Sequence, residues 1–286
     1  MNRRTRSHTW LVALIILIGV VVGAPSDGLA DEAATQPRPD PRASVSVDSQ
    51  MKTIGIIGGI SWVSSIEYYR LMNERVRDQL GGVSSAKLLM YSIPFSEFAR
   101  EERRAADGDW APLEATMLDA AQRLQRAGAD FIVIASNTMN SSAELIEAKL
   151  NIPVLHIADA TGRKVKEQGI SKVALLGTAY TMGQAFYRDR LERHGLEVVV
   201  PNEPERQDIN AVIFDELCAG RFLDDSRERF VEIIERLVKE EGAQGVILGC
   251  TEIPLLIKQS DVSVPVFDTT AIHSEAAVRH ALELDE

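Results

Sequence analysis

Cysteine is scarce in this 286-residue chain, which contains only Cys218 and Cys250. Two cysteines are too few for a zinc cluster or for the disulfide framework of a small secreted domain, and the sequence has no CxxC or HExxH pattern. Positive charge is also in deficit, because 31 Lys and Arg stand against 42 Asp and Glu, for a net charge of −11. Nucleic-acid binders neutralise phosphates with clustered basic residues, so we expect no nucleic-acid partner and no metal.

The remaining composition is that of a globular protein. Hydrophobic residues make up 45% of the chain and charged residues 26%, which excludes a disordered or collagen-like chain. The length suits one or two domains of ordinary size.

The first thirty residues are typical of a secretory signal peptide. Three early arginines precede an apolar run over 10–24, and Gly28 and Ala30 offer a cleavage site after Ala30. The run is shorter than the roughly 20 residues that span a membrane. We therefore predict cleavage, no stable membrane insertion afterwards, and a periplasmic or secreted product. An uncleaved N-terminal anchor is the alternative. The proline-rich stretch 31–50 is predicted to be a flexible linker.

Short β-branched runs alternate with amphipathic segments from Met51 onward. Strands are predicted over 52–58, 87–93, 131–135, 153–157, 171–177 and 197–201, and helices over 63–80, 112–127, 142–150, 185–194, 207–219 and 230–241. This alternation is typical of an α/β fold in which helices cover both faces of a parallel sheet.

The second half of the chain repeats the first. Residues 128–138 align with 242–252 without a gap, and Ile-Pro-Val-Leu at 152–155 then falls on Val-Pro-Val-Phe at 264–267. An internal repeat of this length indicates a duplicated four-strand unit.

The fold class that follows is α/β, with two pseudo-symmetric flavodoxin-like (Rossmann-like) parallel-sheet domains. We place the first domain at 51–160 and the second at 161–270, with a C-terminal helix over 271–284 that packs back on the first. Ligands of open parallel sheets bind beyond the carboxyl ends of the strands. The active site is therefore predicted in the cleft between the two domains.

The repeat equates Ser136 with Cys250, each just past the end of a predicted strand. Two acid/base groups on opposite sides of a small substrate have the geometry to take a proton from one face of a carbon and return it to the other. The pairing therefore indicates stereochemical inversion or a related proton transfer.

Five motifs, in order, resemble those of the aspartate/glutamate racemase superfamily. They are Thr53–Gly59, Ser136-Asn137-Thr138-Met139, Gly177-Thr178 with Thr181, Gly249-Cys250-Thr251-Glu252, and Asp268–His273. The resemblance covers about residues 51–283. It is nearest to the aspartate/glutamate-specific or broad-specificity subgroup, which carries a single catalytic cysteine.

The resemblance implies an isomerase, namely an amino-acid racemase that works without a cofactor, and it also implies a homodimer. Its catalytic pair corresponds here to Cys250 and Ser136. Its substrate-binding positions correspond to Asn137, Thr138, Thr251, Thr178 and Glu252. Each catalytic position is expected to lead into a helix N-terminus, which lowers a thiol pKa and attracts a carboxylate.

The chain departs from the family pattern at three places. Serine replaces the first cysteine at position 136, asparagine replaces a histidine at 140, and Gln207 stands where a substrate-binding lysine is expected. A hydroxyl needs a partner base to act. Two alternatives therefore stay open: a single-cysteine decarboxylase or one-sided proton-exchange enzyme, and an envelope protein that binds small carboxylates without turnover.

Other polar residues have simpler interpretations. Cys218 is predicted to belong to the core, with a Cys218–Cys250 disulfide as the alternative. His156 is predicted to be structural, whereas His273 is equally compatible with a structural or a catalytic role. The Arg103-Arg104 region is predicted to be a solvated loop.

Overall fold

The computed structural model describes residues 50–106 and 108–284. The predicted signal peptide and all but the last residue of the predicted linker lie outside this range. The described residues belong to one compact unit. No helix within them is long and apolar enough to cross a membrane.

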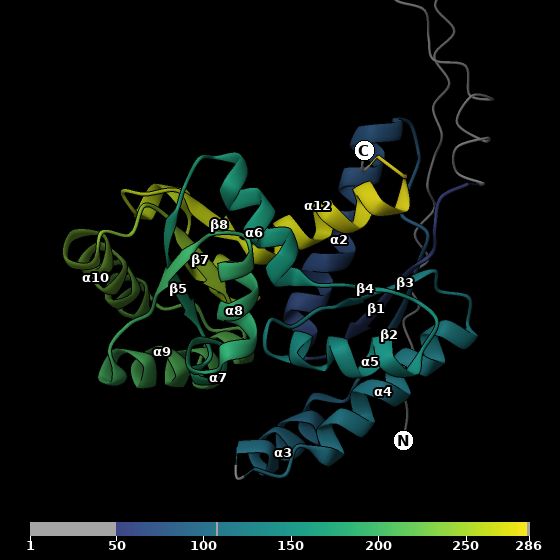
Figure 1. Ribbon diagram of the computed structural model, residues 1–286, viewed down its shortest axis with the longest axis horizontal. Coiled ribbons are helices and arrows are strands. Elements are labelled where there is room, and N and C mark those ends of the chain that lie inside the picture. The colour runs from purple at the N-terminus through teal and green to yellow at the C-terminus, as the bar shows by residue number, and fades with distance from the viewer. Residues whose placement is uncertain (1–49, 107, 285–286) are drawn as a thin grey trace, which may run out of the picture. The chain divides into compact units, whose positions relative to one another are not determined.

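Eight strands form two parallel sheets with the same strand order (Figure 1). The first sheet, ordered β2-β1-β3-β4, contains β1 (Ile54–Gly58), β2 (Leu88–Ser92), β3 (Phe131–Ile134) and β4 (Val154–Leu155). The second, ordered β6-β5-β7-β8, contains β5 (Lys172–Gly177), β6 (Glu197–Val199), β7 (Val246–Gly249) and β8 (Val266–Asp268). The shared order confirms the predicted pair of parallel-sheet units.

Alternate residues of the first sheet pack against different helices, as the two-residue period of a strand requires. Ile56 and Val133 face α2 (Trp62–Leu80) and α12 (Thr269–Ala281). Their neighbours Ile57 and Ile134 face the other layer, which consists of α3 (Phe95–Ala106), α4 (Ala111–Arg126) and α5 (Ala143–Lys149). All four strand residues are buried, so the sheet is covered on both faces.

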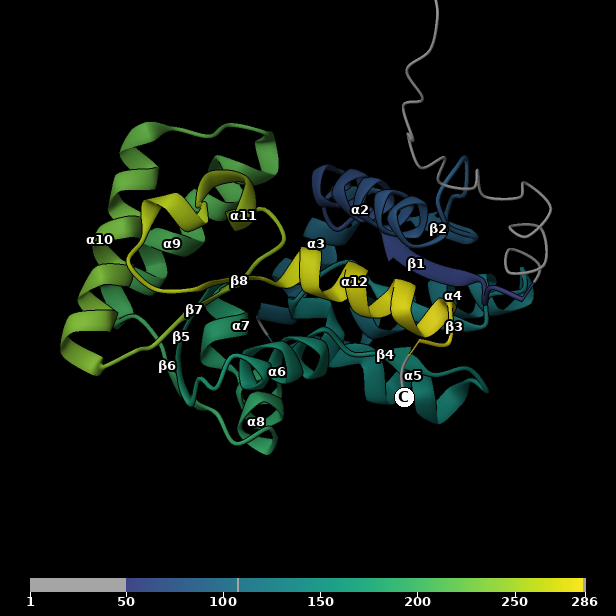
Figure 2. The same ribbon diagram turned by 90° about the horizontal axis from the view of Figure 1, so that it is seen from above.

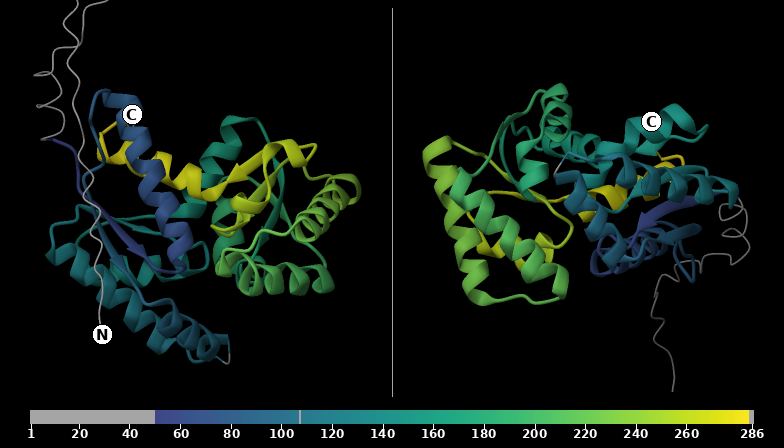
Figure 3. Two further views of the ribbon diagram at one scale, coloured as in Figure 1. Left: turned by 180° about the vertical axis from the view of Figure 1, so that it is seen from behind. Right: turned by 90° about the horizontal axis from the view of Figure 1, so that it is seen from below.

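The second sheet is built in the same way. Val173 and Ile247 face α6 (Ile157–Glu167) and α8 (Ala185–Arg193). Ala174 and Leu248 face α9 (Glu203–Asp215) and α10 (Asp224–Glu241), which Figure 3 shows in green, side by side. Two short helices, α7 (Ala179–Gly183) and α11 (Ile253–Leu256), follow the ends of β5 and β7.

The two halves exchange helices. Helix α6 follows β4 of the first sheet but packs on the second, and α12 follows β8 of the second sheet but packs on the first. Figure 2 shows α12 in yellow, crossing from β8 to lie beside α2. The backbone N–H of Lys52 donates to the carbonyl of Ala281 at 3.0 Å, which fixes the far end of α12. The predicted domain boundary at residue 160 falls inside α6.

The exchanged helices are capped by residues at equivalent places. The imidazole Nδ1 of His156 accepts the N–H of Ala158 at 3.1 Å, at the start of α6. The carboxylate of Asp268 accepts the N–H groups of Thr270 and Ala271, at 2.9 and 3.0 Å, at the start of α12. Side-chain acceptors at this position satisfy donors that the first helical turn leaves without partners.

The structure corrects two predictions. The Arg103-Arg104 region is part of helix α3, not a loop, although both arginines are exposed. Few apolar residues mark this helix, because its buried face is narrow. The strand predicted over 153–157 is only Val154–Leu155, since the cap at His156 starts α6 at once.

Candidate active site

One small cavity is lined by all seven residues that the sequence singled out. Ser136, Asn137 and Thr138 reach it from the first half, and Thr178, Cys250, Thr251 and Glu252 from the second. Its volume is about 40 Å³, enough for a few water molecules. The residues predicted from the two halves of the repeat therefore meet at one site.

Cys250 lies next to a carboxylate. Its thiol donates a hydrogen bond to Oε2 of Glu252 at 3.2 Å, and the hydroxyl of Thr251 donates to the same oxygen at 2.9 Å. The other oxygen of Glu252 accepts the hydroxyl of Ser61 at 2.6 Å. Glu252 is only 3% exposed, so three donors compensate for the burial of its carboxylate.

The resting form of Cys250 is the neutral thiol. Burial raises the pKa of this thiol well above its ordinary value, and the nearby Glu252 carboxylate raises it further. The backbone N–H of Glu252, which bonds the sulfur, works in the opposite direction. The expectation that a helix N-terminus lowers the thiol pKa is therefore wrong here. The helix that follows, α11, is only four residues long, and desolvation outweighs its effect.

The equivalent end of the first half has different partners. The hydroxyl oxygen of Ser136 accepts the backbone N–H of Met139 at 3.3 Å. Asn140, which replaces the family's histidine, donates through its amide to the carbonyls of Ser136 and Ile134, at 2.7 and 3.2 Å, and accepts the N–H of Ile157 at 3.1 Å. Asn140 thus holds the backbone below Ser136 and offers it no base.

A side chain just past each of β3 and β7 makes hydrogen bonds to the opposite half of the chain. The hydroxyl of Thr138 lies 3.0 Å from that of Thr178, which caps α7, and 3.1 Å from that of Thr181, which lies in α7. The position equivalent to Thr138 in the repeat is Glu252, which bonds Ser61 in the turn after β1. The two halves therefore close the cavity by reciprocal contacts from matching positions.

The side chain of Asn137 is fully engaged with neighbouring residues. Its amide donates to the hydroxyl of Thr269 at 3.0 Å and accepts the hydroxyl of Tyr187 at 2.9 Å. These two bonds fix the orientation of the Asn137 side chain at the cavity wall.

The two candidate histidines lie outside the cavity lining. His273 is fully buried, with Nδ1 3.0 Å from the hydroxyl of Tyr68 and Nε2 2.7 Å from the carbonyl of Leu155. These contacts join α12 to α2 and β4. Burial lowers the pKa of His273 to about 4, so the ring is neutral near pH 7. Its surroundings are those of a structural residue.

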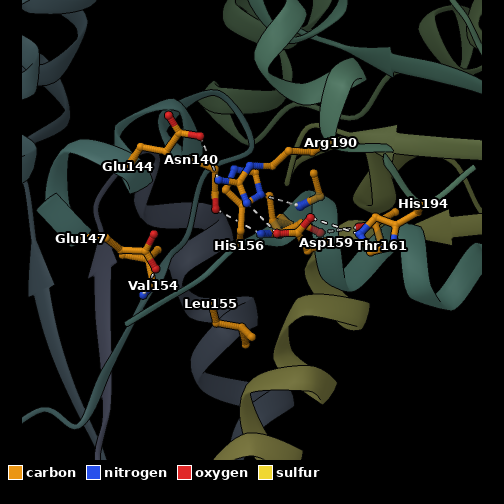
Figure 4. A network of polar contacts seen from close by, with 12 residues as sticks. Asn140, Glu144, Glu147, Val154, Leu155, His156, Asp159, Thr161, Arg190 and His194 are labelled. Atoms are coloured by element: carbon orange, nitrogen blue, oxygen red, sulfur yellow. Dashed lines mark hydrogen bonds and ion pairs between the residues drawn. The ribbon is translucent and has the colours of Figure 1, made fainter. Parts of the chain in front are cut away.

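His156 belongs to a polar network between the halves (Figure 4). Next to the cap that it forms, Asp159 accepts Arg190 of α8 at 2.6 Å and lies 3.1 Å from Nε2 of His194. Arg190 also lies 3.4 Å from Glu144 of α5. The network links α5, α6 and α8 and therefore supports the structural interpretation of His156.

Gln207 also lies away from the cavity lining. It is exposed on α9, where its amide donates to Glu203 at 3.0 Å. Its position thus gives no information about the preferred substrate side chain.

Sequence reasoning missed part of the cavity wall. Phe95, Phe98 and Glu102 come from α3, Cys218 from the turn that ends α9, and Ser61 from the loop after β1. Cys218 packs against the core as predicted, but it also lines the cavity. It is a free thiol, as is Cys250. The helical spacing of Phe95, Phe98 and Glu102 was the signal available for α3.

The described residues contain no group of three His, Cys, Asp or Glu side chains arranged to hold a metal ion. The polar groups that converge on the cavity are hydroxyls, thiols, carboxylates and backbone amides. Such a set can exchange protons with a bound carbon acid.

The profile of the Asp/Glu/hydantoin racemase family matches residues 57–277. This chain belongs to that family. The sequence-based assignment to the amino-acid racemases, and with it to the isomerases, is confirmed.

Relatives cover the folded part nearly end to end. The broad specificity amino-acid racemase RacX of Bacillus subtilis is 23% identical over 231 residues, which are 79% of this chain and 96% of RacX. The crystal structure of a candidate Asp/Glu racemase from Yersinia pestis is 50% identical with a TM-score of 0.74, and the match covers 81% of this chain and 100% of that one. An aspartate racemase homologue from Pyrococcus horikoshii is 41% identical with a TM-score of 0.70, over 81% and 99% of the two chains.

Proposed function

We propose that this protein is a cofactor-independent amino-acid racemase, of aspartate/glutamate or broad specificity, that removes and returns the proton at Cα. The observation that carries the proposal is the pairing of Cys250 with Glu252 on a cavity wall that Ser136 also lines. Racemisation needs one group that takes a proton and another that supplies one from the opposite face.

The Cys250 side supplies the base. Glu252 accepts the thiol proton, and the resulting thiolate takes the α-proton of the substrate. A bound substrate ammonium group favours the thiolate, because an opposite charge lowers the thiol pKa that burial has raised. The neutral resting thiol is then converted to a base only when substrate is present.

The Ser136 side supplies the returning proton, either from its hydroxyl or through a water molecule held there. The donor then regains a proton from solvent, and Glu252 releases to solvent the proton that it took from the thiol, which restores the starting state. The backbone N–H groups at Asn137 and Thr251, with the hydroxyls of Thr138 and Thr178, hold the α-carboxylate. Donors fixed at this position also stabilise the negative charge that develops as the carbanion forms.

A one-sided proton-exchange enzyme is the second candidate. The observation in its favour is the asymmetry between the two ends, because Cys250 bonds a carboxylate whereas Ser136 is held by backbone contacts. Such an enzyme would exchange the α-proton of one enantiomer and retain configuration.

The export of the enzyme is part of the proposal. The arginines and the apolar run of residues 1–30 support a periplasmic or secreted racemase that supplies or consumes D-amino acids outside the cytoplasm. Mass spectrometry of the N-terminus after expression would test it, with a mature chain that begins at Asp31 expected.

Incubation with L- and D-amino acids in deuterated water tests the chemistry. We expect deuterium at Cα together with inversion of configuration, without added cofactor. Exchange with retention would favour the one-sided enzyme. Protection of the protein by ligand without any exchange would favour a binding protein.

A further inference from the structure

Helix α3 supplies a wall of the cavity that the strand-end motifs do not provide. Phe95, Phe98 and Glu102 are spaced three and four residues apart, so they share one face of the helix. Ile213 of α9 lines the same cavity and adds a further apolar side chain. The cavity therefore offers a substrate side chain both hydrocarbon and a carboxyl group.

The wall has an excess of negative charge. Glu102 and Glu252 both line the cavity, and no lysine, arginine or histidine among the described residues does. Burial raises the pKa of Glu102 to about 7, and Arg103, whose side chain is exposed, offsets this only partly. The adjacent Glu101 has a buried carboxylate oxygen without a hydrogen-bond partner. The arginines beside Glu102 on α3 are exposed, so the positive charge of this turn lies outside the cavity lining.

Substrate charge is discriminated strongly in such a setting. A carboxylate beside a largely buried carboxylate is repelled, whereas a cationic group there restores the lost solvation. The methylene groups of a long basic side chain pack on phenylalanine and isoleucine while the charged end reaches the acid.

We propose that Glu102 selects the substrate side chain, favouring amino acids whose side chains end in a cation, such as lysine, over aspartate and glutamate. This inference rests on the proposed racemase function and names its substrate class. Phe95 and Phe98 hold the hydrocarbon part of the side chain, and Glu102 binds its charged end.

The test compares three L-amino acids on the full chain: lysine, norleucine, which has a similar length without the charge, and glutamate. Deuterium exchange at Cα gives kcat/KM for each at pH 8. We expect lysine to exceed norleucine by about tenfold or more, with glutamate slowest. Glu102→Gln should lower the value for lysine by about tenfold and that for norleucine much less, so that the preference for lysine is lost. Glu97→Gln is the matched control, because it removes the same charge from an exposed position on α3.

A second readout does not depend on turnover. A ligand that binds the native state raises the melting temperature. Lysine should raise it in the wild type and in Glu97→Gln but not in Glu102→Gln, and glutamate should not raise it in the wild type. An unchanged preference in Glu102→Gln, or glutamate acting as well as lysine, would overturn the assignment. Lysine binding that depends on Glu102 without exchange would reject the racemase function while supporting the recognition.

Discussion

The two strand ends at the cavity occupy equivalent places in a duplicated fold, yet they are equipped differently. After β7, the Cys250 thiol donates to a buried carboxylate that is itself held by Ser61. After β3, the Ser136 hydroxyl accepts a backbone N–H, and Asn140 fixes the chain below it. Both groups occupy equivalent positions in the duplicated fold, but one is a thiol and the other is a hydroxyl, which is a far weaker acid. The two ends thus differ in their acid/base group and in its hydrogen-bond partners, while burial remains the main cause of the raised pKa of Cys250.

Placing a serine at both strand ends should lower activity more than any other change considered. In Cys250→Ser, Glu252 faces a hydroxyl, which is a far weaker acid than a thiol, so we expect α-proton exchange to fall by about a thousandfold or more. Exchange in deuterated water measures it. Cys218→Ser makes the same chemical change at the other cysteine of the wall and should cost less than about tenfold. Equal losses in the two variants would contradict the assignment of Cys250.

Removing the carboxylate while keeping its shape is the next test. Glu252→Gln retains hydrogen bonding to Ser61 but cannot accept the thiol proton, so kcat should fall by about a hundredfold with a smaller change in KM. Ser61→Ala removes only the support of the carboxylate and should cost less. If the two variants lose activity equally, Glu252 acts by holding the loop after β1.

Much of this arrangement followed from the sequence. The repeat predicted two sheets of the same order and brought Ser136 and Cys250 to matching strand ends, because strand periodicity and glycine turns are local signals. The contact between Ser61 and Glu252 had no local signal, since 191 residues separate them. Glu102 was missed for a related reason. Half of the residues in its helix are charged, and only packing against the cavity distinguishes Glu102 from the others.

The residues that cap the two exchanged helices, His156 and Asp268, affect the stability of the fold in acid in opposite ways. Burial lowers the pKa of His156 to about 3 and raises that of Asp268 above its ordinary value. A histidine whose pKa is lower in the folded state than in the unfolded state stabilises the fold above its unfolded pKa of about 6.5. This stability is lost as the pH falls toward 3. The raised Asp268 acts in the opposite sense, because the folded state binds its proton more readily.

We therefore expect His156 to account for a loss of about 2 kcal/mol in unfolding free energy between pH 6.5 and 5. His156→Asn keeps a capping side chain that does not titrate, so the slope with pH should decrease. His273, with a pKa lowered to about 4, should contribute to the slope that remains, and Glu102, whose pKa burial raises to about 7, should oppose it. Urea unfolding at a series of pH values measures both. An unaltered slope in the variant would assign the acid sensitivity to other groups.

Restoring a thiol at the weaker end should have the smallest effect. Ser136→Cys places a stronger acid on the second face, and we expect the slower direction of racemisation to gain about tenfold. The equilibrium constant between enantiomers is one, so kcat/KM is the same from either side and any asymmetry lies in kcat. The two kcat values, measured at saturating L and D substrate, should become more alike. Measuring both initial rates tests this. Ser136→Ala is the control and should slow the same step.

The exchange of α6 and α12 also affects when the first half can fold during synthesis. The first sheet has one face covered by α12, whose last residue is Ala281 of 286. A chain still emerging from the ribosome lacks that cover until the residues of α12 have been made, so one apolar face of the first sheet stays exposed until then. The first half therefore cannot complete its core before the second half has been synthesised. The export proposed above, by a route that carries unfolded chains, would benefit from that delay.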